Sequence, residues 1–273
     1  MEEESVLTRT RTGIGYPLTP DLLKELEQWH GGPETPADFD PTGSWTQTYR
    51  IVTTAGFYEN AYSNVGHLKI TRTPRSTDET FTLRVDQEVV HAESVTHIFY
   101  AEITCKNDTF ASPITWSLSS HFVGPDGERR ANLDQNEIGR VEDGTVTIQI
   151  NGVENVQKGQ VTGDWCLFEA VQRLPFGSSG SLAFDLLEGM SIVRLGQKLS
   201  YRRHDGDLHS FHQLGSGALP YQYWLNDRHQ LMIVVTGARA YLLDPEAKKR
   251  TAAQEEAGKR LYAIKKEYYA PKT

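Results

Sequence analysis

Chemically useful side chains are concentrated between residues 197 and 214, in the segment QKLSYRRHDGDLHSFHQL. Two stretches in which apolar and polar residues alternate flank Asp205-Gly206. An Asp-Gly pair between such stretches predicts a β-hairpin with a two-residue turn. In this register one face carries a cation, a phenol, a hydroxyl and an imidazole beside leucines. The residues expected on that face are Leu199, Tyr201, Arg203, Leu208, Ser210, His212 and Leu214.

This face has the side chains of a small-molecule site. Arg203 is suited to hold a carboxylate or phosphate through two parallel hydrogen bonds. His212 is suited to accept or donate a proton near neutral pH. Tyr201 and Ser210 would orient a polar group of the ligand. The alternative is that this face has no function. Arg203 would then pack over Tyr201 at the surface of the sheet, and His212 would be hydrogen-bonded to a neighbouring residue.

The opposite face of the expected hairpin carries a weaker constellation. His204, Asp207 and His209 are residue types that bind first-row metals. Their spacing is not specific, however, and Arg202 between them would repel a cation. We therefore expect solvated charge on this face, and neither a metal nor another cofactor.

Aromatic residues supply the apolar surface that a ligand pocket requires. Such pockets combine apolar walls with a few polar anchors. Trp116 and Tyr223 are the candidates for lining one, although most aromatic residues of a barrel belong to its core. His97 shares its predicted face with Val95 and Phe99, which favours a hydrogen-bonded interior histidine over a ligand.

Composition excludes several classes of function. The net charge is −8 with a pI of about 5.6, and no basic stripe is present, so we expect no nucleic-acid partner. No apolar run approaches the roughly 20 residues of a membrane-spanning helix. The acidic start MEEESVLTRTRTG has no apolar core, which favours a cytoplasmic protein. Dinucleotide, phosphate-loop, zinc-protease and Cys-pair motifs are missing from the sequence.

The elements around the hairpin are mostly strands of alternating character. In residues 80–90, Phe81, Leu83 and Val85 alternate with polar residues, and residues 114–123 show the same period of two. We expect about eleven strands, at spacings typical of meanders and barrels. The predicted fold is mainly β, an antiparallel meander closed or curved into a barrel-like sheet. No alternation of strand and helix indicates a parallel sheet.

Three helices accompany the strands in this prediction. One covers residues 19–30, a short internal one runs from Asp164 to Leu174 with a Glu169–Arg173 pair, and one runs from Pro245 to about Tyr268. The expected organisation is an N-terminal extension at 1–42, a β domain at 43–244, and a C-terminal helix in 245–273 packed on that domain.

The sequence contains two cysteines, Cys105 in an expected strand and Cys166 in the expected internal helix. Their spacing fits no zinc or redox motif. Buried free thiols are the favoured interpretation, and a disulfide is the alternative if the compartment is oxidising.

Gly43-Ser44-Trp45, after a segment rich in Pro and Asp, resembles the Gly-x-Trp signature of lipocalins. The resemblance also includes Arg239 and the helix after the last strand. It implies that Trp45 closes one end of an antiparallel barrel and that the other end opens on an apolar ligand cavity. The strand region is longer than one lipocalin barrel, so an open, strongly curved sheet around a helix, as in bacterial lipoprotein carriers, fits equally well.

Three functions are compatible with this sequence. The first is a binding protein that holds an apolar or amphipathic small molecule in a barrel-like cavity. The second is a cofactor-independent lyase, isomerase or cyclase in which His212, Tyr201 and Arg203 are catalytic. The third is an interaction protein that has no pocket and uses the charged C-terminal helix. The sequence does not indicate the oligomeric state.

Overall fold

The structure is a computed structural model that describes Pro20, Trp29 and residues 31–53, 64–75, 79–91, 95–237 and 239–268. For residues 64, 203–205, 258, 261–262 and 264–268 only the backbone is described. The helix expected over residues 19–30 falls almost entirely outside the described residues.

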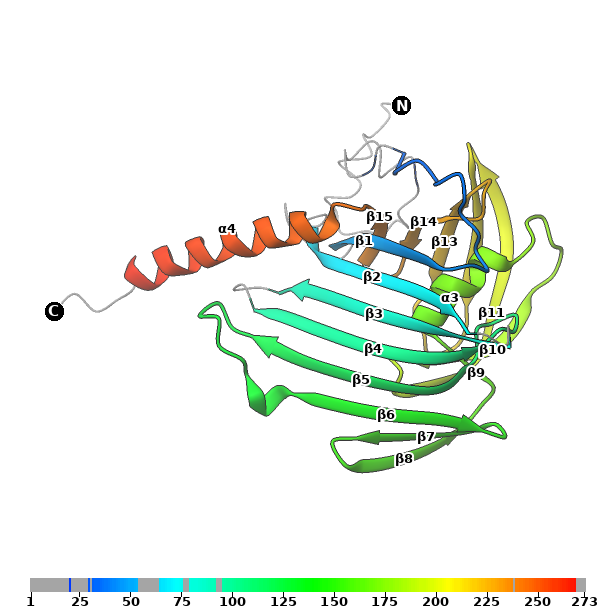
Figure 1. Ribbon diagram of the computed structural model, residues 1–273, viewed down its shortest axis with the longest axis horizontal. Helices are drawn as coiled ribbons and strands as arrows, with labels where there is room; N and C mark the ends of the chain where they lie inside the picture. Colours follow the sequence, from blue (N-terminus) through cyan, green and yellow to red (C-terminus); the bar gives the residue numbers. More distant parts are fainter. Residues whose placement is uncertain are drawn as a thin grey trace, which may run out of the picture.

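A single large sheet dominates the described part of the chain (Figure 1). It contains fifteen strands in the order β8-β7-β6-β5-β4-β3-β2-β1-β15-β14-β13-β12-β11-β10-β9. Neighbouring strands are antiparallel except for β9 and β10, which are parallel. The strands are β1 Trp45–Thr53, β2 Asn64–Pro74, β3 Thr80–Val90, β4 Thr96–Lys106, β5 Pro113–Val123, β6 Gln135–Glu142, β7 Thr145–Ile150, β8 Val153–Lys158, β9 Val161–Gly163, β10 Leu182–Glu188, β11 Ile192–Asp205, β12 Leu208–Leu214, β13 Tyr221–Asn226, β14 Leu231–Val235 and β15 Arg239–Leu243.

The chain passes through this sheet in two halves. Strands β1 to β8 run outward to one edge, and the chain then crosses through Gly159 and Gln160 to β9 at the other edge. It returns strand by strand to β15, which pairs with β1, with Tyr49 opposite Leu243. The expected antiparallel, barrel-like sheet is confirmed, but no backbone ladder joins β8 to β9, so the barrel is not closed.

Side chains join the two edges where backbone pairing is missing. The Gln157 amide on β8 donates to the carbonyl of Ser191 at 3.0 Å and accepts from the amide of Val193 at 2.9 Å. The Ser191 hydroxyl donates to Glu137 on β6 at 2.7 Å. We call these three bonds the seam, because they link the β6–β8 edge to the β10–β11 hairpin.

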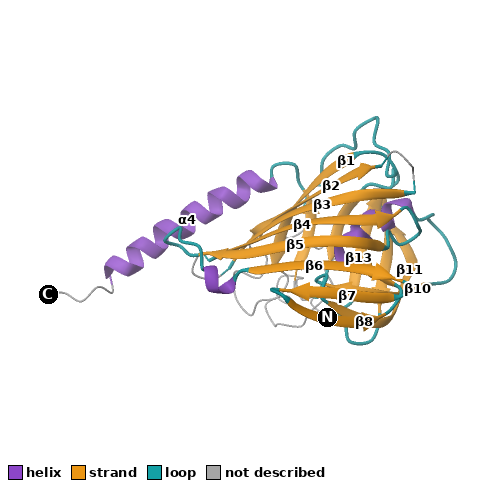
Figure 2. Ribbon diagram, turned by 60° about the horizontal axis from the view of Figure 1, so that its bottom comes forward, coloured by secondary structure: helices purple, strands orange, loops and turns teal. Residues whose placement is uncertain are grey.

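A short helix lies inside the curve of the sheet. Helix α3, Asp164–Ala170, is followed by a 3-10 turn, Val171–Arg173. Residues 165–170 are all buried. Both views place α3 between the two halves of the sheet (Figures 1 and 2). The predicted internal helix is therefore confirmed, and the arrangement is the curved sheet around a helix that the sequence left as an alternative.

Buried ionic bonds fix the C-terminal end of α3. Glu169 accepts from Arg72 on β2 at 2.8 Å and from Arg173 at 2.8 Å, which confirms the predicted Glu169–Arg173 pair. Arg72 also donates to the carbonyl of Gly43 at 2.9 Å and is paired with Trp45 across the sheet. This end of the barrel-like sheet is thus filled by side chains that tie α3 to the segment before β1.

The C-terminal helix α4, Ala247–Tyr268, contacts β2 and β1. Ala247 and Thr251 in its first turns are buried, and its later turns extend away from the sheet (Figures 1 and 2). It begins two residues after the predicted start. Among the described helices, none is long and apolar enough to cross a bilayer.

The expected number of about eleven strands is wrong, because β6, β8 and β9 were not predicted. Strand β8 has the sequence VENVQK and is almost entirely exposed, so it lacks the alternation that identifies a half-buried strand. Strand β9 has only three residues. Residues 192–205 also form one strand, so β11 begins five residues before the segment predicted as the hairpin.

The predicted register of the hairpin is wrong, by two residues next to the turn and by one residue beyond Tyr201. Asp205 pairs with Leu208, so the two-residue turn is Gly206-Asp207, and the register shifts again between Tyr201 and Arg203. Tyr201 consequently pairs with Phe211. A shift of one residue moves side chains to the other face of a strand. Tyr201 therefore leaves the face that carries Ser210 and His212, whereas Arg203 pairs directly with Ser210.

Candidate functional site

A cavity of about 190 Å³ lies on the concave side of the sheet, against the N-terminal half of α3. Its wall draws residues from both halves of the sheet and from the helix. We call it the inner pocket. It is lined by Gln87, Phe99, Leu118, Gln135, Asp164, Trp165, Phe168, Gly189, Tyr221 and Tyr241.

Asp164, the first residue of α3, brings a carboxyl group to this pocket. Its Oδ2 accepts a hydrogen bond from the amide of Gly189 at 2.6 Å. Its Oδ1 is buried and has no hydrogen-bond partner in the structure. Burial is the main cause that raises the pKa of Asp164 to about 7; the Gly189 bond lowers the pKa, and the charge of Glu188 contributes to the increase. Near neutral pH this carboxyl can therefore donate or accept a proton.

The walls around Asp164 are aromatic. Tyr241 meets the Phe168 ring edge to face, with centroids 5.4 Å apart. Burial raises the pKa values of both Tyr221 and Tyr241, so the two phenols stay neutral at physiological pH. Neutral rings around one carboxyl suit an apolar ligand that has a single hydrogen-bonding group.

Two predicted ligand-lining residues, Trp116 and Tyr223, belong to the inner wall outside this pocket. The Trp116 indole donates to Glu137 at 2.6 Å, close to the seam. The Tyr223 hydroxyl donates to Gln213 at 2.8 Å, and its ring stacks beside Tyr221. Both side chains are buried. They support the wall and do not line the inner pocket.

Tyr201 takes part in a different group of side chains. Its hydroxyl lies 3.0 Å from Nδ1 of His209, and Nε2 of His209 lies 2.9 Å from Asp227. The Phe176 ring stacks between His209 at 3.7 Å and His229 at 3.9 Å. Tyr201 and His209, which the predicted register put on opposite faces, are thus hydrogen-bonded to each other.

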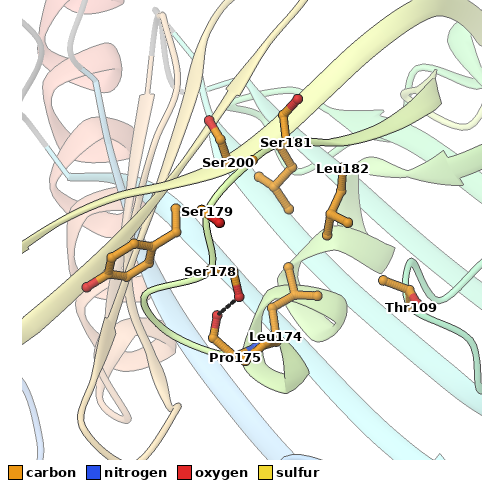
Figure 3. Close-up of a pocket in the computed structure, with 11 residues that line it drawn as sticks. Thr109, Leu174, Pro175, Ser178, Ser179, Ser181, Leu182 and Ser200 are labelled. Carbon is orange, nitrogen blue, oxygen red and sulfur yellow. Dashed lines mark hydrogen bonds between the residues drawn. The ribbon is translucent and has the colours of Figure 1, made fainter.

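Tyr201 also borders a second cavity, of about 270 Å³, beside the loop at residues 174–182 (Figure 3). This loop is rich in serine, and Ser178 donates back to the carbonyl of Pro175 at 3.1 Å. In the close-up, the labelled side chains that surround this cavity come from the loop, from Thr109 and from Ser200. Those labelled side chains include no carboxylate and no imidazole.

His212 and Ser210 do not join Tyr201. Tyr201 pairs with Phe211 and shares its face, and the neighbours of Phe211 in β12 point to the other face. The backbone register therefore separates Tyr201 from His212 in the predicted catalytic set, whereas Arg203 pairs with Ser210, two residues before His212. The side chain of Arg203 lies outside the described residues.

The weak metal candidates are also dispersed. The side chain of His204 lies outside the described residues, Asp207 is exposed in the turn, and His209 is bonded to Tyr201 and Asp227. In the part of the chain that the structure describes, no group of three or more His, Cys, Asp or Glu side chains could hold a metal ion.

Asp164 was not among the predicted site residues. Its sequence context, Gly163-Asp164 before Trp-Cys-Leu-Phe, is typical of a helix start. The signal that could have found it is the continuous apolar run after it, which indicates a fully buried helix and hence a buried carboxyl at its first position.

The chain matches no family model and no curated protein. Among solved structures it is similar to a β-barrel-like protein of a domain of unknown function, DUF1849, from Brucella abortus. The TM-score is 0.49 at 9% sequence identity, over 74% of this chain and 96% of that chain. A similarity this low assigns neither a family nor a function to the chain.

Proposed function

We propose that this protein binds a small, mostly apolar molecule in the inner pocket and that Asp164 is its polar anchor. The observation that carries the proposal is Oδ1 of Asp164, buried without a partner in a cavity with aromatic walls. Buried polar atoms in folded proteins are almost always hydrogen-bonded. A ligand that carries a donor or an acceptor would complete this one.

The size of the cavity limits the ligand. Sites for drug-sized molecules enclose about 300–1,000 Å³, whereas the inner pocket encloses about 190 Å³. A molecule with a single ring and a short polar substituent fits this volume. Because the pKa of Asp164 is about 7, the carboxyl can donate to a carbonyl or accept from a hydroxyl or amide of the ligand.

A catalytic version of the site is the second candidate. A carboxyl with a pKa near the working pH is suited to general acid–base chemistry. A lyase, isomerase or cyclase reaction at this pocket would use Asp164 in place of His212, Tyr201 and Arg203. Recovery of two interconvertible compounds from the purified protein would favour this candidate over simple binding.

The test of binding starts with native mass spectrometry of the protein purified from its own source, which should show a bound small molecule. Saturation-transfer NMR with 3-phenylpropionamide, a neutral single-ring amide, then probes the pocket directly. Leu118→Trp places a large side chain in the pocket and should abolish the signal. Leu133→Trp adds the same ring at an exposed position and should leave the signal unchanged.

The position of the site is tested separately. Asp164→Asn should weaken binding of the amide by about tenfold, because it removes the carboxyl and keeps the shape. Binding that survives Leu118→Trp unchanged, in a variant that thermal unfolding shows to be folded, would place the ligand elsewhere and overturn the proposal.

A further inference from the structure

Basic side chains follow the walls of the inner pocket along the same face of the sheet. On β4, His97 precedes the pocket residue Phe99 by two positions, and on β15, Arg239 precedes the pocket residue Tyr241 by two positions. Residues two apart in a strand point to the same side. His97 and Arg239 are therefore on the concave face, next to the pocket. His91 directly follows β3, the strand that supplies Gln87.

Contacts confirm that the histidines border the pocket wall. The His97 ring lies 3.9 Å from that of Phe99 and 3.8 Å from that of Phe122. The His91 ring lies 6.0 Å from that of His97. Nε2 of His97 is buried and has no hydrogen-bond partner in the structure. A second unpartnered polar atom thus lies at this end of the pocket.

Among the described residues, the titratable groups that act on the pKa values of these rings are all basic. Burial is the main cause that lowers the pKa of His97, to about 4, and repulsion from His91, Arg239 and His121 adds to it. Burial and Arg239 also lower the pKa of His91. Among the described residues, no carboxylate forms an ion pair with His91, His97 or Arg239. The guanidinium of Arg239 lies against the Tyr241 phenol, which is neutral.

We propose that His91, His97 and Arg239, the cationic mouth, bind the carboxylate of a ligand whose apolar part occupies the inner pocket. This inference rests on the proposed function and adds the chemical class of the ligand, a small aromatic or branched monocarboxylic acid. Arg239 can bind a carboxylate through two parallel hydrogen bonds. Neutral His97 can donate to the same anion through its Nε2–H, and a ligand with a second polar group would place that group on Oδ1 of Asp164.

The experiment compares 3-phenylpropionate with 3-phenylpropionamide, which have the same ring and chain and differ in charge. Calorimetric titration of the intact protein at one pH should show the carboxylate binding at least about tenfold more tightly than the amide. Arg239→Gln should reduce this preference to about one, while the affinity for the amide changes by less than about twofold. His97→Gln should reduce the preference in part.

The control is Arg84→Gln. Arg84 is exposed and pairs with Glu102 at 3.0 Å, so its loss should leave the preference unchanged. If both probes bind equally to the native protein and Leu118→Trp abolishes the binding of both, the inner pocket is supported as the binding site and the cationic mouth is refuted. If neither probe binds, the proposed function fails, and this inference fails with it.

Discussion

The Asp164 carboxyl makes the stability of the protein depend on pH in an unusual direction. Its pKa is about 7 in the folded chain, against an ordinary value of 3.8. The folded state therefore retains a proton that the unfolded state has already released between these two values. Stability is greatest below pH 4 for this group alone and falls as the pH rises through 7.

The test of this dependence is Asp164→Asn. Ionisation of Asp164 should destabilise the native protein by at most about 4 kcal/mol above pH 7, a limit that solvent reaching the half-buried residue will reduce. Urea unfolding from pH 4 to pH 8 should show this loss in the native chain and a flatter profile in Asp164→Asn. Asp143→Asn, in an exposed turn, is the matched control. Identical profiles for the native chain and Asp164→Asn would contradict the raised pKa.

At the scale of residues, sequence reasoning found local partners and missed distant ones. The Glu169–Arg173 pair follows from a separation of four residues in a helix, and it is confirmed. The bond from Glu169 to Arg72 joins residues 97 positions apart, which no local pattern indicates. The sequence placed Tyr201 and His209 on opposite faces of the hairpin, whereas the shifted register brings them onto one face, where they are hydrogen-bonded.

At the scale of elements, the seam is the structural feature with the clearest energetic consequence. Gln157 supplies one donor and one acceptor to the β10–β11 hairpin, as a residue of a paired strand would. The two bonds of Gln157, with the bond from Ser191 to Glu137, thus join the two edges where there is no backbone ladder. Edge strands otherwise present unpaired backbone groups that invite association with other chains.

Gln157→Ala should remove this connection. We expect a loss of about 1–2 kcal/mol in the free energy of unfolding, because two part-buried bonds are lost. Hydrogen exchange of the Val193 amide, which donates to Gln157, should become faster in the variant. Glu154→Ala, also on β8 and exposed, should change neither quantity. Unchanged protection of Val193 would show that the seam does not hold the edges together.

Strands with a buried face were predictable, and strands without one were not. Residues 80–90 and 145–150 have the bounds that alternation predicts. Alternation arises when one face is buried and the other is solvated. Strands β6 and β8 have few buried residues, and β9 is short. Apolar and polar residues therefore do not alternate clearly enough in these segments for the sequence to predict the strands.

At the scale of the whole molecule, the sheet curves around α3. The sulfur atom of Cys166 in α3 lies 3.8 Å from the sulfur atom of Cys105 in β4. Both residues are free thiols. This agrees with the favoured interpretation of the sequence. Burial and the neighbouring thiol raise the pKa of Cys105, which makes it a poor nucleophile in the folded protein.

Labelling of these two thiols should therefore report the global unfolding of the sheet. Under native conditions a small thiol reagent should modify neither cysteine faster than the chain unfolds, and both should react in denaturant. Ser178→Cys introduces a thiol in an exposed loop and should react at once. Rapid labelling of Cys105 or Cys166 in the native chain would show that α3 leaves the sheet without global unfolding.

The overall shape was predictable as barrel-like, and its closure was not. Alternating strands at short spacing favour a curved antiparallel sheet, which is confirmed. The Gly43-Ser44-Trp45 resemblance suggested a lipocalin, and membership of that family is not shown. Closure depends on whether β8 meets β9, which involves two of the strands that sequence patterns did not mark.

The pairing of β1 with β15 has a consequence for how the protein is made. During synthesis from the N-terminus, the residues of β2 to β8 can pair in order as they leave the ribosome. One edge of β1 has no partner until residues 239–243 have been synthesised. Contacts this distant in sequence slow folding, so the nascent chain carries an open edge strand for most of its translation. Until that last strand is made, this edge of β1 can pair with another chain.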